Sequence, residues 1–230
     1  MVQLLDILEY LVMNIANNDP SNDSELTCYR KTAHALDILF RSTKLRMIDG
    51  EHCSKATKDA RNINMRYVED ENDKKDLLGR KIDLVIQGSQ TEISSSEWKK
   101  KNTTFRIIQE QRVKNLRTNS AMLHKLSKLI HKDDTFLCGM DWVGYVGFLF
   151  AISPVSDTHS VYSMGDLIFL KDTLDTLFKY KHHHQNLLKI IEPAYEKFEV
   201  RKRLNMLRSP PTDSTPKRKR QKKTNAENKE

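Results

Sequence analysis

The sequence has little of what defines several large protein classes. Its 3 cysteines, Cys28, Cys53 and Cys138, form no CxxC pair, which indicates neither a disulfide framework nor a zinc knuckle and favours a reducing compartment. Its 7 glycines form neither a GxxxxGK(S/T) nor a GxGxxG loop, so kinases, P-loop ATPases and Rossmann dehydrogenases are disfavoured. The sequence also lacks a GxSxG elbow, which argues against a serine hydrolase of that kind.

Long apolar runs are missing as well. The most apolar stretch, residues 142–152, has 11 residues, about half of the ~20 that a membrane-spanning helix needs. The N-terminal segment has apolar residues at helical spacing but no basic flank and no small-residue cleavage site, so it predicts an amphipathic helix rather than a signal peptide. We therefore expect no membrane partner.

What remains is the composition of a folded, soluble protein. The chain has 230 residues, of which 38% are hydrophobic and 30% charged, which suffices for a packed core. We expect an N-terminal amphipathic helix and loop over residues 1–23, a single α/β domain over residues 24–207, and a disordered basic tail over residues 208–230.

Half of the net positive charge lies in residues 209–230. Residues 209–230 contain seven basic and three acidic residues, a net charge of +4 against +8 for the whole chain. Such a compact basic cluster, with no aromatic residue to stack on bases, is typical of a segment read by a nuclear import receptor. We therefore expect nuclear localisation, through Lys217, Arg218, Lys219, Arg220, Lys222 and Lys223.

Periodicity predicts a mixture of helices and strands. Helices are expected at residues 24–40 and 105–132, strands at 45–48, 81–87, 91–99 and 142–152, and a further hairpin strand near 160–163, with another at 167–170. Residues 51–76 fit either an inserted helix or a mobile excursion, and a last helix should end near Glu192, with a shorter piece starting at Pro193. The fold class is α/β or α+β, with a mixed central sheet flanked by helices.

Two of these strands carry charged residues that could perform chemistry. Asp83 lies on the opposite face of its strand from Ile82 and Leu84, and Glu97 and Lys99 share a face of the next strand. Carboxylates can hold a divalent metal that polarises a phosphate and activates water, and a lysine can steady the phosphate. We therefore expect a Mg²⁺ or Mn²⁺ site at Asp83 and Glu97, with the Trp98 carbonyl as a further oxygen ligand.

The spacing of Asp83 and the Glu97-Trp98-Lys99 triplet resembles the signature of the PD-(D/E)xK nuclease superfamily, although no proline precedes Asp83. The element order also resembles that superfamily's αβββαβ core, as in restriction endonucleases. This resemblance implies metal-dependent hydrolysis of nucleic acid with Asp83, Glu97 and Lys99 as catalytic residues, Glu25 as a further metal ligand, and an assisting polar side chain at Gln109 or Gln111. The segments GRKIDLVIQ, SSSEWKK, QEQRVKNLRTN and DWVGYVGFLF also look like a set of uncharacterised fungal proteins with a nuclease-like core.

The helix that follows Lys99 is rich in basic residues. On a nuclease this surface would guide the nucleic acid strand, with DNA as the favoured partner, whereas the plain alternative is a solvated helix face. We expect Arg117 and Asn119 to be the main phosphate contacts. The whole predicted nucleic-acid-binding set is Gln109, Gln111, Arg112, Lys114, Arg117 and Asn119.

Three alternatives stay open at this stage. One is that the charges form only an exposed cross-strand group, and another is that the fold serves as a catalytically inactive nuclear module that binds nucleic acid or protein. A third is a scaffold that binds protein through residues 142–150, if that strand lies at a sheet edge. The register of the hairpin matters, because a slip of one residue would turn Glu97 and Lys99 to the other face.

Overall fold

A computed structural model describes residues 2–16, 23–65, 78–155, 158–166 and 170–208. The predicted import cluster at residues 217–223 lies outside these ranges. Nuclear localisation and the import receptor therefore stay predictions. None of the helices in the described ranges is long and apolar enough to cross a membrane.

The described residues build an α+β fold around one mixed six-stranded sheet, as predicted. The strands lie in chain order, and only β3 and β4 run parallel to each other. Their bounds are β1 Arg46–Cys53, β2 Lys81–Gly88, β3 Thr91–Lys99, β4 Leu137–Val143, β5 Val146–Val155 and β6 Thr158–Asp166. The helices are α1 Val2–Leu11, followed by a π-helical turn Val12–Ala16, α2 Glu25–Phe40, α3 Lys55–Met65, α4 Phe105–Ile130 and α5 Leu170–Arg208.

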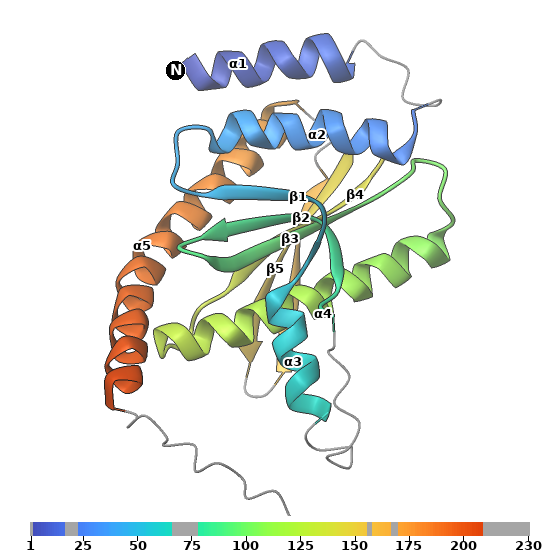
Figure 1. Cartoon of the computed structure of the whole chain (residues 1–230). Helices are drawn as coiled ribbons and strands as arrows, with labels where there is room; N and C mark the ends of the chain where they lie inside the picture. Colours follow the sequence, from blue (N-terminus) through green and yellow to red (C-terminus); the bar gives the residue numbers. More distant parts are fainter. Residues whose placement is uncertain (1, 17–22, 66–77, 156–157, 167–169, 209–230) are drawn as a thin grey trace, which may run out of the picture.

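Helices α2 and α4 cover opposite faces of the sheet, and α1 lies on the outer side of α2 (Figure 1). The order α2–β1–β2–β3–α4–β4 is the expected helix, three strands, helix and strand, with α3 inserted between β1 and β2. Helix α2 begins where the sequence predicts, because the Ser24 hydroxyl accepts a hydrogen bond from the Thr27 N–H at 3.1 Å.

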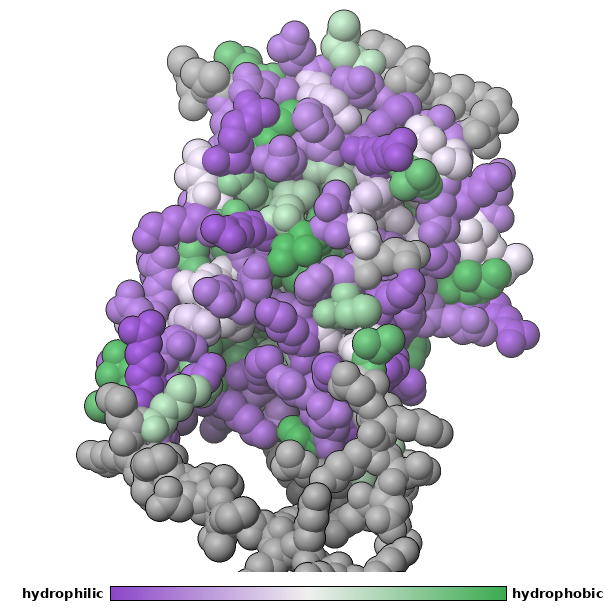
Figure 2. Space-filling view, in the orientation of Figure 1, coloured by the Kyte–Doolittle hydropathy of each residue, from purple (hydrophilic) through white to green (hydrophobic). Residues whose placement is uncertain are grey.

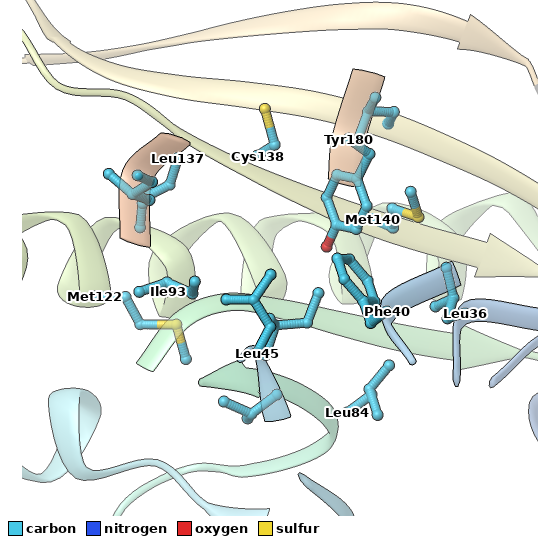
Figure 3. Close-up of a cluster of buried hydrophobic side chains, with 14 of the residues drawn as sticks. Leu36, Phe40, Leu45, Leu84, Ile93, Met122, Leu137, Cys138, Met140 and Tyr180 are labelled. Atoms are coloured by element: carbon cyan, nitrogen blue, oxygen red, sulfur yellow. The ribbon is translucent and has the colours of Figure 1, made fainter. Parts of the chain in front are cut away.

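The core lies mainly between the sheet and the α2 and α5 helices. Figure 3 shows the Tyr180 side chain of α5 pointing toward Phe40 of α2, and their rings meet edge to face at 5.9 Å. The buried Tyr180 hydroxyl shares a hydrogen bond with Ser94 of β3 at 2.8 Å. Ile7 of α1 is completely buried in the same core, so the N-terminal helix packs as part of this body. The face seen in Figure 2 is mainly hydrophilic, with apolar residues in small groups.

The β2–β3 hairpin changes register once. Gly88 pairs with Thr91 across a two-residue turn, whereas Ile86 pairs with Ser94, which leaves Ile93 without a partner in the register of β2. This extra residue is a β-bulge, which shifts the pairing of all later residues by one position. The bulge therefore determines which β3 side chains face α4.

Several predicted boundaries are wrong. The predicted strand 142–152 is two strands, β4 and β5, joined at Gly144 and Tyr145. Because each is paired on both sides, residues 142–150 lie at no sheet edge, and the edge-docking alternative is wrong. Strand β1 continues through Gly50, which has a positive φ of 79°. Helix α5 begins at Leu170, part of the range predicted as a strand, and continues through Pro193 instead of ending near Glu192.

Candidate active site

Asp83 and Glu97 lie side by side on neighbouring strands. The register that pairs Leu84 with Ser96 leads, one residue further along, to Asp83 beside Glu97. Without the bulge, the register at the turn would set Glu97 opposite Ile82 and turn its side chain to the α2 face. The predicted pair of carboxylates therefore exists on one face, and it depends on the bulge.

Of Asp83 and Glu97, Glu97 is the more deeply buried. The residue is 3% exposed, and its Oε1 atom has no hydrogen-bond partner among the described residues. Burial, followed by the neighbouring Asp83 carboxylate, raises the pKa of Glu97 from 4.5 to about 7. An unpaired, buried carboxylate oxygen next to a second carboxylate is a position that a cation would stabilise.

Asp83 is held in place by the backbone of the next strand. Its Oδ2 atom accepts a hydrogen bond from the Trp98 N–H at 2.8 Å. Burial raises the pKa of Asp83, while this hydrogen bond and the charge of Lys99 act in the opposite direction. The hydrogen bond uses one carboxylate oxygen and fixes the direction of the other.

Lys99 and Glu25 meet at the edge of the pair. The Lys99 Nζ atom lies 3.1 Å from Glu25 Oε1 and donates a hydrogen bond to the Trp98 carbonyl at 2.7 Å. Glu25, at the start of α2, also acts electrostatically on Asp83. Helix α2 thus brings Glu25 to the site as predicted. However, the Glu25 carboxylate and the Trp98 carbonyl both contact Lys99. Their roles as metal ligands stay predictions.

Asp141, which precedes the most apolar run of the sequence and is expected from that position mainly to pack at the entry of a strand, is a further acid beside this pair. It lies in register with Glu97 on the parallel strand β4, so the side chains of both residues face α4. Burial raises the pKa of Asp141 to about 6, although the side chains of Asn115 and Gln111 hydrogen-bond to the carboxylate. A lone aspartate within an apolar strand was the only sequence signal for this position.

Two cations approach Glu97 from outside the predicted triplet. Lys114 of α4 places its Nζ atom 3.9 Å from Glu97 Oε2. Arg80, just before β2, donates a hydrogen bond to the Lys114 carbonyl at 2.6 Å, and its guanidinium interacts electrostatically with Glu97. The positive charges of Lys114 and Arg80 offset part of the negative charge of the Asp83 and Glu97 carboxylates.

The predicted nucleic-acid-binding residues divide between two faces of α4. Asn119 is fully buried and hydrogen-bonds to the backbone of Ser95, so the prediction that it contacts phosphate is wrong. Gln111 is also buried. Gln111, Asn115 and Asn119 follow each other at i, i+4 spacing and form the stripe that packs on the sheet. The residues still accessible for a polyanion are Gln109, Arg112, Lys114 and Arg117.

The carboxylates fit a magnesium ion better than a metal held by many protein ligands. Among the described residues, no group of three or more His, Cys, Asp or Glu side chains is placed to hold a metal ion. Mg²⁺, however, is commonly bound through one or two carboxylates, water and the phosphates of a substrate. Asp83 and Glu97, with the unpaired Glu97 Oε1 atom, meet this smaller requirement.

Comparison with known proteins finds no matching family model, no matching curated protein and no matching solved structure. The interpretation of the site therefore depends on its own geometry.

Proposed function

We propose that the protein is a metal-dependent nuclease that hydrolyses phosphodiester bonds, with DNA as the favoured substrate. The single observation that carries the proposal is the buried Glu97 carboxylate with an unpaired oxygen, set beside Asp83 on the adjacent strand. A buried acid beside a partly buried one costs free energy unless a cation offsets their charge. The Asp83 and Glu97 carboxylates would hold the Mg²⁺ or Mn²⁺ ion.

In this proposal, the metal ion and a few side chains share the steps of phosphodiester hydrolysis. A bound Mg²⁺ or Mn²⁺ would polarise the phosphate and lower the pKa of an attacking water. Lys99 and Lys114 place ammonium groups close enough to act electrostatically on the carboxylate pair, where they can steady the phosphate oxygens. Asp83 stays oriented through the Trp98 N–H. The accessible basic residues of α4, above all Arg117, extend this positive surface away from the site.

Metal titration of purified variants tests the proposal. We expect calorimetry to detect binding of Mg²⁺ or Mn²⁺ to the wild type. In a parallel assay, the wild type should nick a plasmid. Asp83→Ala should abolish both, and Lys99→Ala should abolish nicking while the protein remains folded. The matched control is Glu110→Ala, since Glu110 is an exposed acid on α4 that pairs with Arg106. A folded wild type that neither binds metal nor nicks DNA, or unchanged cleavage in both site variants, would overturn the proposal.

A second candidate is a nucleic-acid-binding module without turnover. The contacts of Lys99 favour it, because the Lys99 amine already interacts with the Glu25 carboxylate and the Trp98 carbonyl rather than pointing freely at a substrate. Under this alternative, DNA binding falls as salt rises and weakens in Arg117→Ala, but it needs neither metal nor Glu97. Metal-independent binding with no cleavage would select this candidate.

A further inference from the structure

A cavity of about 400 Å³ opens beside the candidate active site, between the N-terminal half of α4 and the β4–β5 hairpin. This size lies within the range of about 300–1,000 Å³ typical of small-molecule sites. Its lining is half apolar and half polar or charged, and it includes Ile108, Val143, Val146, Phe148, Gln111 and Asp141.

The cavity lies next to the site, and Asp141 belongs to both. Asp141 lines the cavity and is the register partner of Glu97. A molecule in the cavity would therefore lie one strand away from the Asp83 and Glu97 carboxylates. That separation suits a substrate with a phosphate at the carboxylates and a second group in the cavity.

The lining fits a flat, partly polar ring. Phe105 lies at the start of α4 with 76% of its surface exposed, although it lines the cavity. Gln111 is 5% exposed, and its Oε1 atom is a buried acceptor with no hydrogen-bond partner among the described residues. Apolar side chains together with a buried, unpaired acceptor on a lining residue match a nucleobase, whose faces stack and whose edge carries N–H donors.

Charge near the cavity favours the same occupant. Arg112 and Lys101 line it, and both can contact the phosphates that flank a base. A base inside a duplex is stacked and paired, so it cannot enter such a cavity without leaving the helix. The occupant must therefore be an unpaired base.

We propose that this cavity binds one unpaired nucleobase of a single-stranded nucleic acid, next to a phosphate at Asp83 and Glu97, and that it favours bases with an exocyclic amino group that can donate to Gln111. The inference deepens the proposed nuclease function and rests on that function for the placement of the phosphate. It makes single strands, overhangs or locally opened duplexes the preferred substrates.

Binding of short oligonucleotides in EDTA tests the inference independently of cleavage. We would compare oligodeoxyadenylate, oligothymidylate and an abasic tract of the same length by fluorescence anisotropy. The wild type should bind oligodeoxyadenylate about tenfold more tightly than the abasic tract, with oligothymidylate between them. Val146→Phe, which fills the cavity, should remove most of this difference and leave the affinity for the abasic tract unchanged. The control Ile107→Ala changes a partly exposed residue of the same helix outside the cavity and should keep the full difference.

Equal affinity for the abasic and adenine tracts, or a difference that survives in folded Val146→Phe, would overturn the inference. Failure of the nuclease proposal is recognised separately. A wild type that distinguishes bases in EDTA but never cleaves DNA in Mg²⁺ keeps the base site and loses the nuclease. A wild type that cleaves DNA but binds the adenine and abasic tracts equally keeps the nuclease function and loses the base site.

Discussion

The buried Glu97 side chain makes the stability of the protein depend on pH. Its pKa near 7 in the folded protein, against an ordinary value of 4.5, means that the folded state binds more protons than the unfolded state between these two values. Stability from this group is therefore present below about pH 4.5 and is lost as pH rises through 7. At pH 8 the charged, buried carboxylate destabilises the metal-free protein.

Glu97→Gln should therefore stabilise the metal-free protein at pH 8 by about 1–3 kcal/mol, and the gain should shrink toward zero near pH 4.5. Urea unfolding in EDTA at the two pH values measures the difference. Under the proposed function, addition of Mg²⁺ should reverse the order at pH 8, because only the wild type keeps the carboxylate proposed to bind the ion. Glu110→Gln is the control and should change little at either pH. A variant that is less stable than the wild type at pH 8 would contradict this account of Glu97.

At this scale the sequence predicted the acids of one hairpin better than the groups that reach them from elsewhere. Asp83 and Glu97 could be recognised from strand alternation and motif spacing. The approach of Asp141, and of Lys114 to Glu97 itself, could not, because these positions depend on the parallel register of β4 and on how α4 lies over the sheet. Asn119 was misplaced because a polar residue on a helix predicts exposure, whereas here it satisfies the buried backbone of Ser95.

Among the elements, the β2–β3 hairpin has a turn that its residues do not favour. Ser89 and Gln90 have positive φ angles of 46° and 60°, a conformation that residues with a Cβ adopt at a cost and that Asn-Gly adopts readily. The double variant Ser89→Asn/Gln90→Gly should raise the free energy of unfolding by about 1 kcal/mol, as measured by urea denaturation. The control Lys100→Gly places glycine where φ is not positive and should destabilise instead. Destabilisation by the double variant would show that the turn is held by contacts rather than by local conformation.

The hairpin itself could be predicted, but its bulge could not. The run Ser94-Ser95-Ser96 has no apolar and polar alternation, so nothing in it indicates which side chains face which helix. The turn at Gly144 was missed for a related reason. Strands β4 and β5 are largely buried, and the apolar run continues through the turn that joins them. Hydrophobic pattern thus predicts that a segment is a strand better than it predicts where the strand changes direction.

At the scale of the whole molecule, α1 belongs to the folded body rather than to a separate extension. Ile7 is fully buried, and Gln3 donates hydrogen bonds to the carbonyls of Ile38 and Leu39 at the end of α2. The sequence predicted an amphipathic helix here, but no local pattern states which surface such a helix will cover. The α+β class itself could be predicted because it needs only the order and type of the elements.

Ile7→Ala should therefore lower the free energy of unfolding by about 2–4 kcal/mol, since it leaves a cavity in the shared core. Leu5→Ala on the exposed side of the same helix, where Leu5 is 58% exposed, should cost much less. Helical circular dichroism and the fluorescence of Trp98 and Trp142, which stack on each other within the sheet, should report one common transition in both variants. If the loss of helix came first, with tryptophan fluorescence unchanged, α1 would be an independent appendage.

The bulge at Ile93 also limits how this protein can vary in length during evolution. Insertion or deletion of one residue between the turn and Ser94 would exchange the two faces of β3 and turn Glu97 toward the side where Trp98 now packs against α2. A change of two residues would restore the present orientation. Relatives should therefore differ in this hairpin by even numbers of residues, and an odd change would eliminate the carboxylate pair even where every acidic residue is retained.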